Sequence, residues 1–209
     1  MKFKEIPAGK MSLAKRSCLF GLGINDAIYQ VVYKANGKRL VCPYYRKWVD
    51  MLSRAYSIDF HETNPTYKDV TVCKEWLTFS SFRKWMQRQD WKGLELDKDI
   101  INPGNKVYSP ENCCFVSRGL NALLINSESN RGALPRGVSF NKQKNIFRSD
   151  CRFYGKLKHL GYFGSVELAS LVYRKFKANL VVEAAFDQTD ERIERGLMHH
   201  ARLIMDGVK

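Results

Sequence analysis

The segment from Leu94 to Asn121, LELDKDIINPGNKVYSPENCCFVSRGLN, restricts most strongly how this chain can fold. It predicts a short strand over 93–97, a loop rich in Pro, Gly and Asn over 101–112, a second strand over 113–116 and a helix after that. Ser117 has the residue type of a helix N-cap. A strand, a long loop, a strand and a helix in this order build a ββα unit.

Asp97 ends the first predicted strand, and Asn121 lies close to the start of the predicted helix. If the hairpin folds onto the helix, both side chains meet at one point. A carboxylate and an amide oxygen, together with waters, suit Mg²⁺ or Mn²⁺. Such an ion stabilises the leaving oxygen of a phosphodiester. Zinc is not expected, because none of the six cysteines forms a C-x-x-C pair.

The residues from about Tyr45 to Leu124 resemble the HNH, or ββα-metal, nucleases of phage genomes, which include homing endonucleases. The resemblance lies in TVCKEW, LDKD, YSPENC and the asparagine that follows them. It implies that Asp97 and Asn121 bind the metal, and that Asn112 steadies the general base. The residue at the general-base position, where the family has histidine, is Lys98.

Lys98 departs from the chemistry that this resemblance implies. Histidine, with a pKa of about 6.5, accepts a proton at neutral pH, whereas lysine, at about 10.4, is already protonated. Asp97 and Asp99 on either side favour the charged lysine. Lys98 is therefore better suited to bind a phosphate or to pair with Asp99, and catalysis stays open. His61, in a segment predicted to be a loop over 60–69, is a candidate replacement base.

The segment before residue 93 has clear local signals. Two β-type runs flank Asn36-Gly37, a strong hairpin turn signal, and an amphipathic pattern predicts a helix over 44–57. A further helix is predicted over 76–91. Its aromatic stripe indicates a buried core more strongly than a base-stacking surface.

The net charge of +14 favours an anionic partner, and nucleic acid is the first candidate. The charge is concentrated in residues 131–182, which hold 11 Lys/Arg and 2 Asp/Glu. Three β-type runs occur there, over 137–140, 145–154 and 157–163, and a helix capped by Ser165 follows. We expect a three-stranded antiparallel sheet with one helix packed across it.

Alternation along the middle run places Phe147, Cys151 and Phe153 on one face of this sheet. The other face holds Arg148, Asp150, Arg152 and Tyr154. The apolar face must meet the helix, which leaves a basic face toward solvent. A small sheet of this kind fits the DNA major groove, where arginine reads guanine and asparagine reads adenine.

Residues 135–182 also resemble the DNA-binding domain of plant ethylene-response factors, the APETALA type, through RGVSF, IFRSDCRFYGK, HLGYF and SVELASLVYRKF. That domain occurs fused to phage HNH nucleases. The resemblance implies a set of residues facing DNA: Arg136, Ser139, Asn141, Arg148, Arg152 and His159. It implies phosphate contacts for Lys142 and Lys144. The family often has arginines and a tryptophan where this chain has Ser139, Asn141 and His159, so sequence preference is expected to differ.

We therefore expect an α+β chain with an HNH-like domain over 1–130, a DNA-binding domain over 131–186 and a C-terminal helix over 187–209. The expected function is Mg²⁺-dependent cleavage or nicking of double-stranded DNA in the cytoplasm, that of the host if a phage encodes the chain. The alternatives are a catalytically inactive DNA-binding regulator, a factor that binds a host protein, and an RNA-binding protein. No apolar run long enough for a membrane span occurs, and no signal peptide is expected.

Overall fold

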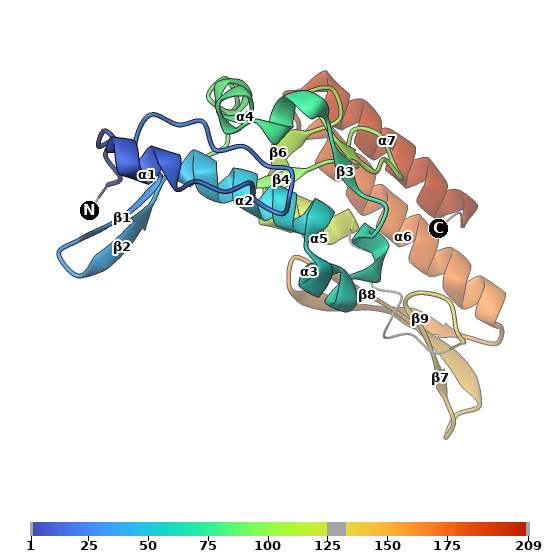
Figure 1. Ribbon diagram of the computed structural model, residues 1–209. Coiled ribbons are helices and arrows are strands. Elements are labelled where there is room, and N and C mark those ends of the chain that lie inside the picture. Colours follow the sequence, from blue (N-terminus) through green and yellow to red (C-terminus); the bar gives the residue numbers. More distant parts are fainter. Residues whose placement is uncertain (1, 125–132, 208–209) are drawn as a thin grey trace. The chain divides into compact units, whose positions relative to one another are not determined.

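The computed structural model describes residues 2–124 and 133–207 (Figure 1). The chain is mixed α+β, with 42% helix and 22% strand, as expected for its class. It divides into two compact units, Met1–Lys92 with Gly104–Phe115, and Gly93–Pro103 with Val116–Lys209. The domain boundary predicted near residue 130 lies outside the described residues.

The first unit begins with α1 (Lys10–Ala14) and a hairpin of β1 (Val32–Ala35) and β2 (Lys38–Val41). The turn has φ values of 50° at Asn36 and 72° at Gly37. Two consecutive positive φ angles match the twist that joins tightly connected antiparallel strands, and Asn-Gly adopts them readily. The predicted hairpin is confirmed.

The core of the first unit is aromatic and lies between α2 (Pro43–Tyr56) and α4 (Phe79–Met86). Trp48, Phe79 and Phe82 are almost fully buried, and Trp48 donates its indole N–H to the carbonyl of Trp76 over 2.7 Å. Trp76 lies in η2 (Lys74–Leu77). The prediction that this stripe forms core is confirmed.

Two elements of the first unit occupy segments whose sequence predicts loops. Residues 58–63 form α3 (Ile58–Thr63), and η1 (Pro65–Tyr67) follows. Ser57 caps α3 by accepting a hydrogen bond from the Phe60 N–H, and Phe60 packs edge-on against Tyr67. The second segment is the predicted loop over 101–112. It contains the strand β5 (Val107–Tyr108), which pairs in parallel with β3 (Thr71–Val72). Capping and long-range pairing therefore outweigh polar composition.

The second unit contains β4 (Glu95–Asp97) and α5 (Arg118–Leu124). The strand β6 (Cys114–Val116) crosses the division between the units. Ser117 caps α5, as predicted, by accepting a hydrogen bond from the Leu120 N–H over 3.1 Å. Strand, loop, strand and helix therefore follow one another in the predicted order.

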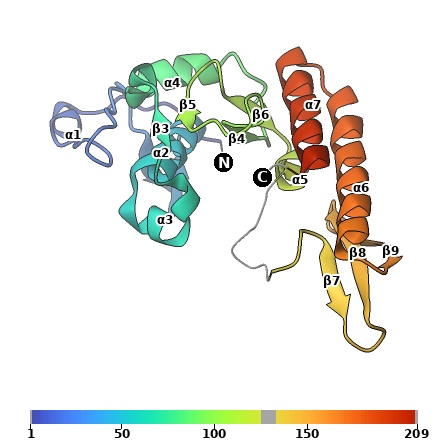
Figure 2. The same cartoon turned by 90° about the vertical axis from the view of Figure 1, so that its right-hand side faces the viewer.

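A three-stranded antiparallel sheet forms the rest of the second unit, together with two long helices. The strands β7 (Val138–Asn141), β8 (Ile146–Phe153) and β9 (Lys156–Phe163) lie in the order β7-β8-β9, with a register shift at Ser149/Asp150. The helix α6 (Val166–Phe186) packs on the sheet, and α7 (Glu191–Asp206) runs beside α6 (Figure 2). The predicted sheet with one helix across it is confirmed.

Among the described helices, none combines the length and the apolar character needed to span a bilayer.

Candidate functional site

Two carboxylates lie on one side of β4. Glu95 and Asp97 are two residues apart on the strand, while Leu96 between them is buried, so both acids point away from Leu96. Asn121 on α5 donates its amide N–H to Glu95 Oε2 over 2.9 Å. The helical asparagine is therefore beside β4, and the carboxylate that it contacts is Glu95. Sequence reasoning missed Glu95, and its alternation with Leu96 and Asp97 is the signal that could have found it.

Asp97 is held by the backbone that follows it. Its Oδ1 accepts hydrogen bonds from the N–H groups of Asp99 and Ile100, each at 2.9 Å. Burial raises the pKa of Asp97 to about 6, and the negative charge of Asp99 contributes to the increase. A buried carboxylate beside a second one is stabilised by a nearby cation.

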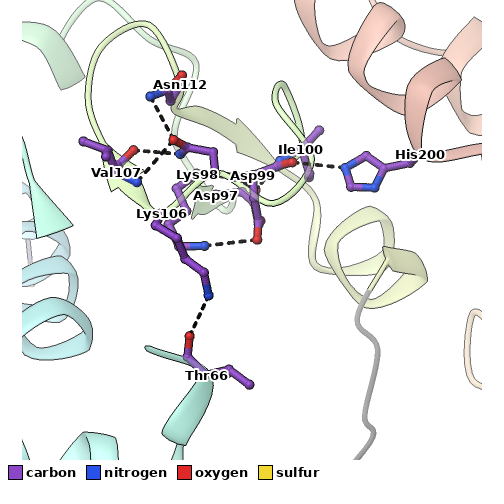
Figure 3. A network of polar contacts seen from close by, with 10 residues as sticks. Thr66, Asp97, Lys98, Asp99, Ile100, Lys106, Val107, Asn112 and His200 are labelled. Atoms are coloured by element: carbon purple, nitrogen blue, oxygen red, sulfur yellow. Dashed lines mark hydrogen bonds and ion pairs between the residues drawn. The ribbon is translucent and has the colours of Figure 1, made fainter. Parts of the chain in front are cut away.

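Lys98 is buried, with 6% of its surface exposed, and pairs with Asp99 (Figure 3). The distance from Lys98 Nζ to Asp99 Oδ2 is 3.0 Å. This is one of the two roles expected for Lys98. An ammonium group that donates to a carboxylate has no lone pair with which to take a proton from water, so the contact favours a positioning role over a general base.

Asn112 belongs to the first unit and holds the loop before β5. It donates its amide N–H to Asn105 Oδ1 over 3.2 Å, and Asn105 in turn bonds both backbone groups of Val107 (Figure 3). Lys106 donates to the carbonyl of Thr66 over 2.9 Å. Asn112 thus supports the irregular loop of this segment.

His61 lies on α3 rather than in the predicted loop. Its Nε2 is 2.9 Å from the carbonyl oxygen of Arg54, an oxygen that only accepts, so Nε2 carries the hydrogen. The ring joins α3 to α2. This contact gives His61 a structural role.

His200 on α7 is not among the site residues that the sequence predicts. Its Nε2 lies 3.1 Å from the carbonyl oxygen of Asp99 (Figure 3), and burial lowers its pKa. The signal available in the sequence was its place next to Leu197 and Ala201, which are part of the buried stripe of α7. His200 positions the turn that carries Asp99.

The residues on and beside β4 carry oxygen atoms of the kind that bind a hydrated divalent cation. Glu95, Asp97 and Asn121 supply carboxylate and amide oxygens, which Mg²⁺ and Mn²⁺ prefer. Within 2–124 and 133–207 there is no group of three or more His, Cys, Asp or Glu residues arranged to hold a metal. These donors therefore do not form an all-protein cage, but Mg²⁺ is commonly held by one or two carboxylates and a substrate phosphate.

The second candidate region is the sheet face opposite α6. Arg148 Nε and His159 Nδ1 lie 2.7 Å and 3.0 Å from the two oxygens of Asp150. The His159 ring packs on Tyr162, and Lys144 Nζ lies 5.1 Å from the centre of the Tyr162 ring. The basic side chains of Arg148 and Lys144 thus lie on the same face of the sheet as the Tyr162 ring.

The remaining predicted DNA-facing residues surround this network. Ser139 lies directly opposite Arg148 and is exposed, as is Arg152 farther along β8. Asn141 Oδ1 accepts a hydrogen bond from the Lys144 N–H over 3.1 Å, which closes the turn between β7 and β8. Lys142 and Lys144 are exposed in that turn.

Arg136 lies apart from this group. Its charge acts on Lys177 and Cys151, which are buried between the sheet and α6. Burial and, to a smaller extent, the charge of Arg136 lower the pKa of Lys177 to about 8. Arg136 therefore lies near the helix-facing side of the sheet.

Comparison with family models, with curated proteins and with solved structures gives no match.

Proposed function

We propose that this chain binds double-stranded DNA through the exposed face of β7, β8 and β9. The observation that carries the proposal is the network of Arg148, His159 and Asp150 on a face whose opposite side is covered by α6. Asp150 restricts the rotamers of Arg148 and His159 before any ligand arrives. Side chains held in this way lose less conformational entropy on binding.

The geometry of nucleic acids favours DNA over double-stranded RNA. The major groove of B-DNA is wide enough to admit a small sheet, whereas that of A-form RNA is deep and narrow. Arg148 and Arg152 project from alternate positions of one strand and would read guanine edges. Lys142 and Lys144 would contact phosphates.

A binding titration tests this proposal. We expect the full chain to bind a labelled duplex of unselected sequence with an affinity that falls steeply as salt rises. Arg152→Gln and Lys144→Gln should each weaken binding, while Lys175→Gln, an exposed charge on α6, serves as the matched control. A flat salt response would contradict the proposal, and so would equal effects of all three variants. A duplex RNA competitor of the same length separates DNA from RNA binding.

We also propose, as a second function, Mg²⁺-dependent cleavage or nicking of DNA at β4, in the manner of HNH endonucleases. The observation that favours it is the pair of carboxylates on one side of β4 with Asn121 bonded to one of them. A divalent ion bound there would neutralise charge on a scissile phosphate. Glu95 and Asp97 would hold the ion, Asn121 would orient Glu95, and Lys98 would keep Asp99 in place.

Two alternatives to cleavage remain, both without catalysis: a DNA-binding regulator and a factor that binds a host protein. The pairing of Lys98 with Asp99 supports these alternatives, because it leaves the usual general-base position occupied by an ammonium group. Supercoiled plasmid incubated with protein and Mg²⁺ or Mn²⁺ distinguishes cleavage from both. The control is Asp97→Asn, which keeps Oδ1 to accept the Asp99 and Ile100 N–H groups. Nicking by the wild type and not by this variant would support cleavage; no metal-dependent nicking would favour the regulator.

A further inference from the structure

The β1–β2 hairpin carries cations in an arrangement that costs stability. Lys34 and Arg39 are directly opposite each other on adjacent strands, and both are exposed. Their side chains therefore point to the same face of the ribbon. Like charges in this position destabilise a strand pair, and a two-stranded ribbon has little stability to spare.

These charges are not offset by a carboxylate of the described residues. Across residues 2–124 and 133–207, neither Lys34 nor Arg39, nor Lys38 at the tip, takes part in an ion pair. Residues 1–40 contain two acids, Glu5 and Asp26. Each of the two is engaged elsewhere, as described next.

Both acids are turned toward α4. Glu5 forms an ion pair with Arg83, and Asp26 Oδ1 accepts a hydrogen bond from the Ser80 N–H over 2.9 Å. The basic side chains of the hairpin are thus exposed to solvent, while Glu5 and Asp26 both contact α4 instead of the hairpin. An arrangement of this kind fits an external anion.

The other face of the hairpin is anchored. Tyr33 packs against Phe3 with ring centres 5.3 Å apart, and its hydroxyl accepts the Lys4 N–H over 2.9 Å. The hairpin projects from the rest of its unit (Figure 1). The anchored face fixes which side of the ribbon presents Lys34 and Arg39.

We infer that this hairpin is a second nucleic-acid contact, which binds the phosphodiester backbone through Lys34, Lys38 and Arg39. The inference rests on the proposed DNA binding and adds a contact in the other unit of the chain. Positively charged side chains on a narrow ribbon, not paired with any acid of the described residues, suit phosphates rather than base edges. Binding there is expected to be independent of sequence.

Two variants of the full chain test this inference. Lys34→Gln combined with Arg39→Gln should reduce the slope of log affinity against log salt by about 1.8, since each phosphate contact contributes about 0.9. The probe is a labelled duplex of unselected sequence. The matched control is Lys68→Gln with Lys74→Gln, which removes two exposed charges from the same unit.

Arg39→Glu separates a lost DNA contact from misfolding, because the unfolding temperature is measured together with the DNA affinity. It places a carboxylate opposite Lys34, so the unfolding temperature should stay equal to the wild-type value or rise while DNA affinity falls. A loss of affinity accompanied by a lower unfolding temperature would contradict the inference.

The outcomes separate this inference from the proposed function. If the sheet variant Arg152→Gln weakens binding but the hairpin variants match the Lys68/Lys74 control, the hairpin contact is wrong and sheet binding stands. If the hairpin variants weaken binding and Arg152→Gln does not, the hairpin contact stands and the sheet proposal is wrong. A wild-type chain without salt-dependent binding would overturn both.

Discussion

His200 on α7 is joined to Asp99 by a contact of 3.1 Å between its Nε2 and the Asp99 carbonyl oxygen. The two residues are 101 positions apart in the chain. The end of β4 at Asp97 and the turn that follows it, with Lys98 and Asp99, are therefore held by the last helix. The arrangement of this acidic turn depends on α7 being packed in place.

Replacing Gly196 with alanine should destabilise the second unit. An alanine Cβ would lie 2.2 Å from the carbonyl oxygen of Ile100, a backbone atom that cannot move aside easily. At a helix position with free space around it, replacing glycine with alanine usually raises the free energy of unfolding by up to about 1 kcal/mol. We expect instead a loss of about 1–3 kcal/mol in the free energy of unfolding. Arg202→Ala, at an exposed position of the same helix, is the control in denaturant unfolding, and equal stability of the two variants would contradict the packing.

Replacing the buried Lys177 with methionine should stabilise the chain at neutral pH. Burial lowers the Lys177 pKa from 10.5 to about 8, so below pH 8 the folded state holds a charge that it disfavours. Between pH 8 and 10.5 the unfolded state binds more protons, and wild-type stability rises relative to the variant. We expect an advantage of about 1–3 kcal/mol for Lys177→Met at pH 7 that shrinks above pH 8.

Thermal unfolding of the two proteins at pH 7 and pH 10 measures this difference. Lys175→Met, at an exposed position of α6, controls for the change of residue type. An advantage that does not depend on pH would mean that packing rather than charge is responsible.

Replacing Asp150 with asparagine should strengthen binding to unselected DNA. The carboxylate holds Arg148 at 2.7 Å and places a negative charge on the proposed DNA-facing surface. On DNA of unselected sequence, the loss of this negative charge should outweigh the looser hold on the Arg148 rotamer. Arg148 can then contact a phosphate where no guanine edge is in reach, so the salt slope should steepen by about 0.9. We expect affinity at about 0.1 M salt to rise roughly two- to fivefold. Asp187→Asn, exposed beyond α6, is the control in the same titration, and an unchanged slope for Asp150→Asn would count against the sheet as the binding face.

Adding Mg²⁺ at pH 7.5 should raise the unfolding temperature of the wild-type chain. A ligand present at about tenfold its dissociation constant stabilises the native state by about 1.4 kcal/mol. Asp97→Asn removes one proposed ligand while keeping its backbone hydrogen bonds, so the shift should disappear. It should also shrink at pH 5, because protons compete for a carboxyl group whose pKa is about 6. Asp69→Asn, exposed in the first unit, is the control, and an identical shift in Asp97→Asn would contradict metal binding at β4.

Several elements were predictable because their causes are local. Asn36-Gly37 predicts a tight hairpin from backbone preferences alone, and Ser165 caps α6 through the nearby Leu168 N–H. Along β8, alternation correctly separated the buried Cys151 from the exposed Arg152. Each of these features depends on residues within a few positions of one another.

Other elements needed contacts that composition does not reveal. The segment that forms α3, with His61, has the polar composition of a loop, yet Ser57 and Tyr67 stabilise it as a helix. The strand β5 exists through its parallel pairing with β3, more than thirty residues earlier. The cap Ser57 and the strand β3 lie outside the residues that form α3 and β5, so the local sequence pattern of α3 or of β5 does not reveal them.

By itself, the sequence determined the α+β class, the basic sheet with its covering helix, and the place of Asp97 at the end of β4. Only the tertiary structure decided that Asn121 meets Glu95, that Lys98 is buried against Asp99, and that α7 holds this turn through His200. The reason is physical: periodicity assigns a side chain to a face, but its partner depends on how α5 and α7 pack, and helix packing is set by contacts between residues far apart in the chain.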